Sequence, residues 1–162
     1  CGILEQGLAR ELGLVGFAAR ASGEAIDARC APGYSPYDLL DTKIITASSG
    51  DVGGRVAVRF GEILESTKLI RAIAERINPG RVSMVLPTPA PGTLGLGCVE
   101  GWRGEVFIAL QVGENGRIHR AHGHDPSWQN WPALEHAVLG NIVPDFPLIN
   151  KSFNLSYAGH DL

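Results

Sequence analysis

The chain has 162 residues, of which 44% are hydrophobic and 19% charged, with a formal net charge of −3. This length and composition predict one globular unit with a real core and exclude a disordered or fibrous protein. Only three lysines occur, and no basic cluster is present. We therefore expect no nucleic acid partner, because phosphate binding requires concentrated positive charge.

Residues 1–80 are predicted to be mainly helical. Leu4, Leu8 and Leu12 recur every four residues within 3–12, which is one stripe of a helix, and Gly13 suits its end. Residues 14–45 mix Gly, Pro, Ser and Tyr, and we expect a long ordered loop with short pieces of structure. The chain opens on Cys1 rather than Met, with a helical pattern under way, so we expect a longer polypeptide.

A long amphipathic helix is predicted over residues 51–77. One side carries Val52, Val56, Phe60, Ile63, Thr67, Ile70, Ala74 and Ile77, and the other Arg55, Arg59, Glu62, Glu65, Arg71, Glu75 and Arg76. Asp51 suits the start of this helix, and Asn78-Pro79-Gly80 should end it. A helix of this length and near-heptad pattern is typical of a bundle.

Residues 81–125 are predicted to be rich in β-structure. Residues 83–86 form a short candidate strand, and 87–97 form a turn region rich in Pro and Gly. Residues 105–112 (EVFIALQV) are rich in strand-forming residues, and 117–122 can return beside them. Asn115-Gly116 between these two runs is a strong hairpin signal.

Residues 126–162 are predicted to hold a short helix and a tail. Asn130 can cap this helix, with Pro132 in its first turn and Gly140 just past its end. Residues 141–149 are expected to be extended or looped, because Pro144 and Pro147 oppose a regular helix. The predicted fold class is α+β within a single unit: long amphipathic bundle helices, a small antiparallel hairpin or sheet, and a carboxy-terminal helix and tail.

Two groups of side chains suggest metal chemistry, and each has a simpler explanation. Cys1, Cys30 and Cys98 lie far apart without any Cys-x-x-Cys spacing, which argues against a disulfide scaffold or zinc knuckle and favours buried or idle thiols in a reducing cytosol. His122 and His124 share a strand face and precede Asp125, so they are candidate metal ligands or a solvent-facing strand end.

Arg103 is the most interesting lone side chain. It lies in Gly101-Trp102-Arg103-Gly104, where flanking glycines let the backbone approach another group closely. A guanidinium held there can contact an anion, a carboxylate or a diatomic ligand, or it can be a surface arginine at a turn. The closely spaced glycines of GTLGLG (92–97) are better explained by turns than by phosphate binding.

Several stretches together resemble one family. GDVGGRVAVRFGEILES (50–66) is similar to a helix of nickel–iron hydrogenase large subunits of the formate-hydrogenlyase type, and to the homologous quinone-site subunit of respiratory complex I. ARELGLVGFAARASG (9–23) resembles the family segment ending Arg-Gly-Ser-Gly, with Ala21 in place of its first glycine. Two later segments resemble the family's E-A-P-R-G-E hairpin and its carboxy-terminal approach: EGWRGEVFIALQVGENGRIHR (100–120) and NWPALEHAVLGNIVPDFPLINKSFNLSY (130–157).

The resemblance implies a subunit whose nickel–iron centre is held by two Cys-x-x-Cys pairs, one of them in a part of the family outside this chain. The carboxy-terminal pair falls on Ser156 and Gly159, so both sulfurs are lost, and His160 alone cannot replace them. We therefore expect no catalytic residue, no nickel–iron centre and no other cofactor in this chain. The resemblance also carries over candidate residues of a cavity or quinone site: Arg103, Glu100, Ser156, Gly159 and His160, with Arg120 in a packing or ion-pair role.

Three hypotheses follow from this resemblance and its departures. The first is a subunit of a membrane-associated oxidoreductase complex, cytoplasmic and peripheral to the inner membrane, whose former metal cavity serves a quinone, electron transfer or conformational change. Its partners would be an iron–sulfur small subunit and membrane-arm subunits. The second is a non-catalytic scaffold or assembly subunit, and the third is a metal module built on His122, His124 and Asp125 or His160. In isolation, we expect an inactive chain that self-associates through the exposed apolar side of its long helix.

Overall fold

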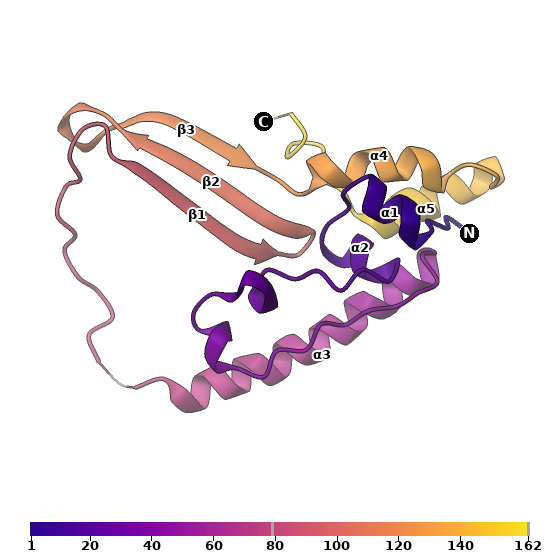
Figure 1. Cartoon of the computed structure of the whole chain (residues 1–162), viewed down its shortest axis with the longest axis horizontal. Coiled ribbons are helices and arrows are strands. Elements are labelled where there is room, and N and C mark those ends of the chain that lie inside the picture. The colour runs from indigo at the N-terminus through magenta and orange to yellow at the C-terminus, as the bar shows by residue number, and fades with distance from the viewer. Residues whose placement is uncertain (79, 162) are drawn as a thin grey trace.

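The computed structural model describes residues 1–78 and 80–161, and it confirms an α+β architecture. Helices form the body of the molecule, and a three-stranded sheet projects away from it (Figure 1). The elements in chain order are α1 (Gln6–Glu11), α2 (Gly16–Ala21), α3 (Val52–Arg76), β1 (Leu94–Gly101), β2 (Gly104–Val112), β3 (Ile118–His124), α4 (Ser127–Ala137) and α5 (Phe146–Phe153). Single helical turns lie at Arg29–Gly33, Tyr37–Leu39, Glu114–Gly116 and Val143–Asp145.

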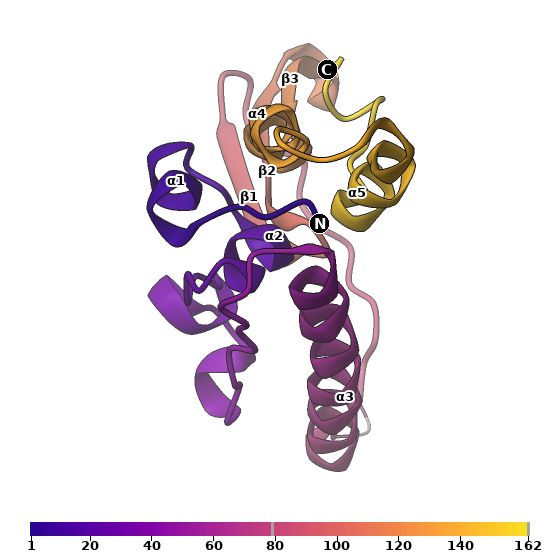
Figure 2. The same cartoon turned by 90° about the vertical axis from the view of Figure 1, so that its right-hand side faces the viewer.

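The long helix α3 begins and ends close to where the sequence predicts. Asp51 caps it, since its carboxylate accepts the backbone N–H of Gly54 at 2.7 Å. The helix ends at Arg76, just before Asn78, whereas Pro79 of the expected stop signal lies outside the described residues. In Figure 2 most of α3 stands apart from α1, α4 and α5.

The orientation of α3 reverses the usual arrangement of an amphipathic helix. Its predicted apolar side faces outward, with Phe60 67% and Ile70 66% exposed, whereas Arg55 and Glu62 are buried. Charged side chains are tolerated inside because they find partners there, described below. The prediction of an exposed apolar helix face is therefore confirmed.

Small residues let the remaining helices pack closely around one core. Alanines of α1, α2 and α4 are almost fully buried and meet larger apolar side chains of α5, namely Ile149 and Phe153. A smaller cluster joins α2 to α3 through Phe17, Ala21 and Val58. None of the described helices is both long and apolar enough to cross a membrane.

The sheet is antiparallel with strand order β1-β2-β3. Its β2–β3 connection contains Asn115 and Gly116 at φ +56° and +70°, values that favour Asn and Gly, so the predicted hairpin is confirmed. The side chains of β1 and β3 are largely exposed, and the buried core clusters take nothing from the sheet. The sheet is therefore an arm of the molecule rather than a wall of its core.

The first strand was predicted in the wrong place. Residues 83–86 form no regular structure, and β1 runs through Leu94–Gly101, part of which was expected to be turn. Gly95 and Gly97 disfavour a strand by propensity, but β1 pairs along its whole length with β2. Backbone hydrogen bonding to a strong neighbouring strand outweighs that local preference.

The helices near both ends also differ from prediction. Helix α1 is shorter than residues 3–12 and begins at Gln6. Helix α4 begins at Ser127, not after Asn130, and the carboxylate of Asp125 accepts the Ser127 N–H at 2.7 Å. Helix α5 covers residues expected to be extended, because Pro147 lies in its first turn, where a missing N–H costs nothing.

Candidate functional site at the root of the hairpin

The turn between β1 and β2 is clamped against two helices. Gly16 has φ +62°, and a Cβ atom there would lie 2.1 Å from the Arg103 carbonyl oxygen, so only glycine fits. The side-chain amide of Asn130 donates to the same carbonyl at 3.2 Å and accepts the Val15 N–H at 3.1 Å. Asn130 therefore fixes the turn rather than capping α4 as predicted.

The Arg103 side chain reaches from this turn to the carboxy-terminal tail. Its Nε donates to the carbonyl oxygen of Asn154, the residue that ends α5 in a left-handed conformation. Arg103 does not line the pocket on the opposite side of the turn, which involves its neighbour Trp102. The arginine singled out from sequence therefore joins the hairpin to the tail.

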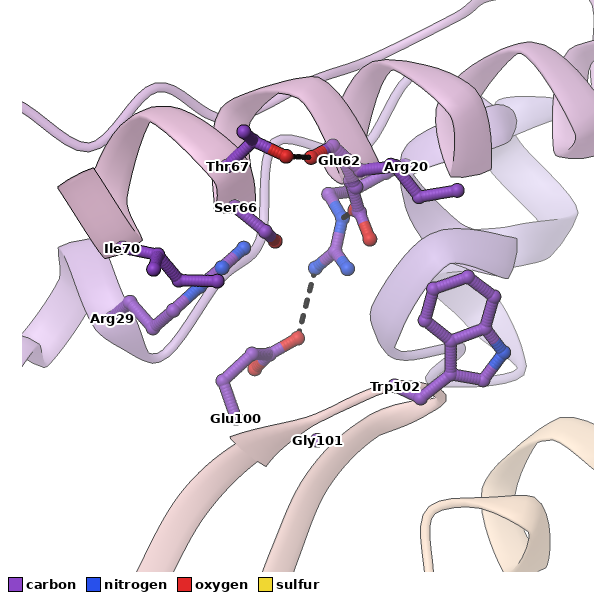
Figure 3. A pocket seen from close by; sticks show the side chains of 10 residues that line it. Arg20, Arg29, Glu62, Ser66, Thr67, Ile70, Glu100, Gly101 and Trp102 are labelled. Carbon is purple, nitrogen blue, oxygen red and sulfur yellow. Dashed lines mark hydrogen bonds and ion pairs between the residues drawn. The ribbon is translucent and has the colours of Figure 1, made fainter.

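A pocket of about 410 Å³ lies between α3 and the root of the hairpin (Figure 3). Its charged side chains come from α2, the turn at Arg29–Gly33, α3 and β1, and its apolar ones from α3 and the hairpin turn. The charged residues are Arg20, Arg29, Glu62 and Glu100, and the apolar ones are Ile63, Ile70 and Trp102. A hollow of this size, lined by both charged and apolar side chains, suits a small amphipathic molecule.

Arg20 is the centre of a buried ionic network in this pocket. Its Nε donates to Glu62 at 2.6 Å and its Nη1 to Glu100 at 2.9 Å. Asp27 lies 3.7 Å from the same guanidinium and also pairs with Arg29 at 2.6 Å. Three carboxylates thus face two guanidinium groups, a formal balance of −1 among buried charges.

Two of these carboxylates differ in how readily they lose a proton. Burial raises the pKa of Glu100, and the hydrogen bond from Arg20 only partly offsets this. Burial also acts to raise the pKa of Asp27, but hydrogen bonds from Arg29 and the nearby positive charges outweigh it, so this pKa is lowered. Protonation of the network should therefore begin at Glu100 rather than Asp27.

A second arginine cluster lies near the start of α3, and it has no carboxylate partner among the described residues. Arg55 is fully buried and donates to Ser152 Oγ, Gly50 O and Gly2 O, each at 2.8 Å. Its guanidinium lies 4.0 Å from the centre of the Phe153 ring. Burial lowers the pKa of Arg55 to about 10, so it stays charged at neutral pH.

Arg59 and Arg103 extend this cluster toward the hairpin. Arg59 donates to Ser152 O at 2.6 Å and lies 4.4 Å from the Phe17 ring centre, while its buried Nε has no partner among described residues. Burial and the nearby Arg103 charge lower the pKa of Arg59. Arg59 and Arg103 both donate to carbonyls at the carboxy-terminal end of α5, where the helix dipole is negative.

Ser156 and Gly159 form one turn held against the start of α4. Ser156 donates its N–H to Ser127 Oγ at 3.0 Å, and its own Oγ accepts the Gly159 N–H at 2.9 Å. A Cβ atom on Gly159 would lie 2.5 Å from the Asp125 side chain. The two positions of the family's cysteine pair are thus neighbours, but their space is filled by local contacts.

The five carried-over site residues do not converge on one hollow. Glu100 lies in the pocket, Arg103 spans to the tail, and Ser156 and Gly159 form the turn. His160 stacks on Trp128 with ring centres 4.9 Å apart. Arg120 is exposed on β3, in register with Gln111 and with no ion-pair partner among the described residues.

The residues present do not fit a nickel–iron centre. Cys1, Cys30 and Cys98 are free and placed in separate parts of the fold, and all three are exposed rather than buried. Partial desolvation and nearby carboxylates still raise the pKa of the Cys30 and Cys98 thiols, which disfavours the thiolate form that binds such metals. Within residues 1–78 and 80–161, no group of three or more His, Cys, Asp and Glu side chains is arranged to hold a metal ion.

The alternative metal site based on histidines is also not formed by these residues. His122, His124 and Asp125 line one hollow of about 270 Å³, but they do not form a ligand set. His124 Nε2 lies 2.8 Å from Gln129 Oε1, and Asp125 serves the start of α4. Their contacts are those of a strand end joined to a helix.

Sequence reasoning missed Arg20, Asp27 and Arg29 as site residues. Arg20 stands within a run of small and apolar residues, Phe17–Ala21, and a lone charge in such a run is a sign of a buried ion pair. Asp27 and Arg29 are two residues apart, so their pairing is local. Arg20, in contrast, pairs with Glu62 and Glu100, which lie 42 and 80 residues away in the sequence. Local sequence patterns do not reveal such contacts.

Comparison with known proteins places these features in a family. Residues 1–94 match the model described as "Respiratory-chain NADH dehydrogenase, 49 Kd subunit". The chain belongs to this family. It is 33% identical over 153 residues to the carbon monoxide-induced hydrogenase of Rhodospirillum rubrum, covering 94% of this chain and 42% of the relative. The resemblance inferred from the motifs is therefore confirmed.

Two further relatives and a solved structure agree. Formate hydrogenlyase subunit 5 of Escherichia coli is 30% identical, covering 99% of this chain and 28% of the relative, and NADH-quinone oxidoreductase subunit 4 of Thermus thermophilus is 32% identical, covering 94% and 44%. A chain of the membrane-bound sulfane sulfur reductase, an archaeal respiratory membrane complex, superposes with a TM-score of 0.87 at 25% identity, covering 99% of this chain and 46% of that one. The chain thus spans less than half the length of these relatives.

Proposed function

We propose that this chain is the carboxy-terminal part of a 49 kDa-type subunit that serves a membrane-associated oxidoreductase complex without a nickel–iron centre. Support comes from family membership and from relatives named as hydrogenase and NADH-quinone oxidoreductase subunits. The main support comes from the carboxy-terminal tail. Ser156 and Gly159 offer no sulfur ligand, and both already contact each other and the start of α4.

The proposed task of the chain is to supply part of a quinone or electron-transfer cavity. Reduction of a quinone places negative charge on its oxygens, and preorganised cations stabilise such charge. Arg55, Arg59 and Arg103 supply cations that no described carboxylate neutralises, and they lie outside the lining of the pocket beside Trp102. The pocket beside Trp102 and Glu100 supports a ring-binding role, since it pairs apolar side chains with ionisable ones.

The proposed partners are an iron–sulfur small subunit and membrane-arm subunits, with the complex peripheral to the cytoplasmic face of the inner membrane. The structure neighbour is named as a respiratory membrane complex, which supports an assembly of this kind. The alternative is a scaffold subunit that binds the same partners without turnover.

Metal analysis of the full-length protein tests the loss of the metal site. We expect no stoichiometric nickel after purification from nickel-supplemented cells. A Ser156→Cys variant should also bind none, because one thiol cannot form the ligand set. Stoichiometric nickel in the wild-type protein would overturn the proposal.

Turnover of the intact complex separates the cavity role from the scaffold role. Trp102→Leu should lower the turnover of a soluble quinone analogue while leaving copurification of the iron–sulfur partner unchanged. Leu139→Ala, a change at an exposed position in the turn after α4, is the matched control and should change neither. An intact complex with no quinone turnover in the wild type would favour the scaffold.

We also propose that the isolated chain self-associates through the exposed side of α3. Phe60, Ile63 and Leu64 are all at least half exposed there, and apolar surface of this kind is normally covered. Sedimentation should show oligomers that Phe60→Glu converts largely to monomers, while Glu75→Gln does not. A monomeric wild type at high concentration would contradict this.

A further inference from the structure

An aromatic hollow lies where the tail folds back on α4, away from the pocket at the hairpin root. Its volume is about 490 Å³, and it is lined by Trp128, Trp131, Pro132, Glu135, Tyr157 and His160. The proposed function uses none of these residues. The hollow therefore needs its own explanation.

The rings form a connected set around this hollow. Trp128 and His160 have centres 4.9 Å apart, Trp131 and Tyr157 5.0 Å, and Trp131 and His160 6.1 Å. Trp128 is 52% exposed and Tyr157 67% exposed, so the aromatic lining is open to solvent. Rings of this size are normally buried, and an open cluster of them marks a surface suited to binding.

Two of these rings already make hydrogen bonds inside the chain. Trp131 Nε1 donates to the Ser156 carbonyl at 3.3 Å, and the Tyr157 hydroxyl accepts from Asn150 Nδ2 at 3.4 Å. What these rings still offer a ligand is mainly their π faces. Aromatic faces carry the negative part of the ring quadrupole and attract cations.

Glu135 gives the hollow a charge of the same sign. It is exposed and has no ion-pair partner among the described residues, so its carboxylate is available at the edge of the rings. We propose that this hollow binds an organic cation, that is, an ammonium or guanidinium group, either on a small molecule or at the end of a lysine or arginine side chain. The site stands independently of the proposed function.

Other ligands fit these observations less well. An anion would be repelled by Glu135 and by the ring faces. A neutral ring or a proline-rich segment could stack on the tryptophans but would gain nothing from the carboxylate. The carboxylate beside the ring faces is the feature that selects positive charge.

Calorimetric titration with matched ligands tests the sign of the charge. Choline should bind the full-length protein, while its neutral isostere 3,3-dimethyl-1-butanol should bind at least about fivefold more weakly, as one or two cation–π contacts and a carboxylate imply. Equal affinity for the two, or binding of neither choline nor a lysine derivative, would overturn the proposal. Stronger binding of Nα-acetyl-lysine amide than of choline would identify a protein side chain as the natural source.

Two surface variants locate the site. Glu135→Gln and Trp128→Leu should each weaken choline binding at least about threefold, while melting temperature stays within a few degrees because both side chains are exposed. Glu114→Gln, an exposed carboxylate on the distant hairpin turn, is the control and should bind like the wild type. Unchanged affinity in both site variants would remove the aromatic hollow as the binding place.

Discussion

Arg20 and Arg55 are both 1% exposed, yet the molecule stabilises them in different ways. Arg20 lies among carboxylates, with Glu62 and Glu100 within hydrogen-bonding distance. Arg55 contacts two backbone carbonyls, a serine hydroxyl and an aromatic face. The comparison shows that two equally buried arginines can have very different partners, so their removal leaves different groups without a partner.

The difference lies in the partners that remain after substitution. Without Arg20, three acidic groups would share a buried region with only Arg29 to balance them. Without Arg55, the abandoned partners would be neutral oxygens. An uncompensated buried charge costs more than an unsatisfied neutral acceptor, so the two sites should respond unequally.

Replacing Arg20 should have the largest effect. Arg20→Met should lower the free energy of unfolding by about 3–5 kcal/mol at neutral pH, because a broken buried ion pair leaves carboxylates unpaired. Urea denaturation measures this. Arg10→Met, which removes a solvent-exposed partner of Glu24, is the control and should cost far less. Equal losses in the two variants would contradict the buried network.

Replacing Arg55 should have the second largest effect. Arg55→Met should lower the free energy of unfolding by about 1–3 kcal/mol, since neutral acceptors lose their donor but a buried charge is also removed. The same urea experiment measures it. A loss larger than that of Arg20→Met would break the comparison, since it would mean that neutral oxygens hold the guanidinium more effectively than carboxylates.

Removing one acceptor of Arg55 sharpens the comparison further. Ser152 Oγ accepts from Arg55 and donates to Ile149 O, so Ser152→Ala should cost about 1 kcal/mol. Thermal unfolding by circular dichroism checks this. Ser83→Ala, at an exposed position without regular structure, should leave the melting temperature unchanged. A double variant with Arg55→Met should lose less than the sum of the two single losses.

The smallest effect concerns pH and the Arg20 network. Because burial raises the Glu100 pKa, its contribution to stability is full below the ordinary value of 4.5 and is lost as pH rises through the folded-state pKa. The advantage of wild type over Glu100→Gln should therefore shrink as pH rises. Denaturation across pH 4–8 measures this trend, and an advantage that grows with pH would contradict it.

Asp51 provides a control of opposite sign for the pH experiment. The Gly54 N–H and the Ser49 hydroxyl lower the Asp51 pKa, so its contribution is present above the ordinary value of 3.8 and lost on acidification. The advantage of wild type over Asp51→Asn should therefore grow as pH rises through the acidic range around and below that value, so this pair is also measured below pH 4. Two variants with opposite trends would exclude a general effect of pH on the fold.

Local signals were enough to predict the elements that carry strong sequence patterns. The cap at Asp51, the length of α3 and the Asn115-Gly116 turn each depend on neighbouring residues, and all are found as predicted. Strand β1 was missed because its glycines predict no strand, whereas its stability comes from pairing with β2. Helix α5 was missed because Pro147 was taken as a breaker rather than a first-turn residue.

The candidate site was less predictable than the fold. The motif around Arg103 indicated an important residue, but the partner of its side chain, Asn154 O, is 51 residues away. Periodicity separated apolar from charged positions on α3, yet in the first part of the helix charged side chains such as Arg55 and Glu62 face inward. Amphipathic pattern alone cannot say which side is buried when charged residues such as Glu62 find buried counter-ions elsewhere in the chain.

The projecting sheet has a mechanical consequence. It is held to the body at its root, where Gly16 meets the Arg103 carbonyl, while the Asn115 turn lies at its far end (Figure 1). At about 3.3 Å per residue, the nine residues of β2 span roughly 30 Å. The strand is therefore a lever, and a tilt of about 5° at the root would displace the tip by roughly 2.5 Å. A spin label at the tip would magnify movements of the arginine-rich root that are too small to detect directly.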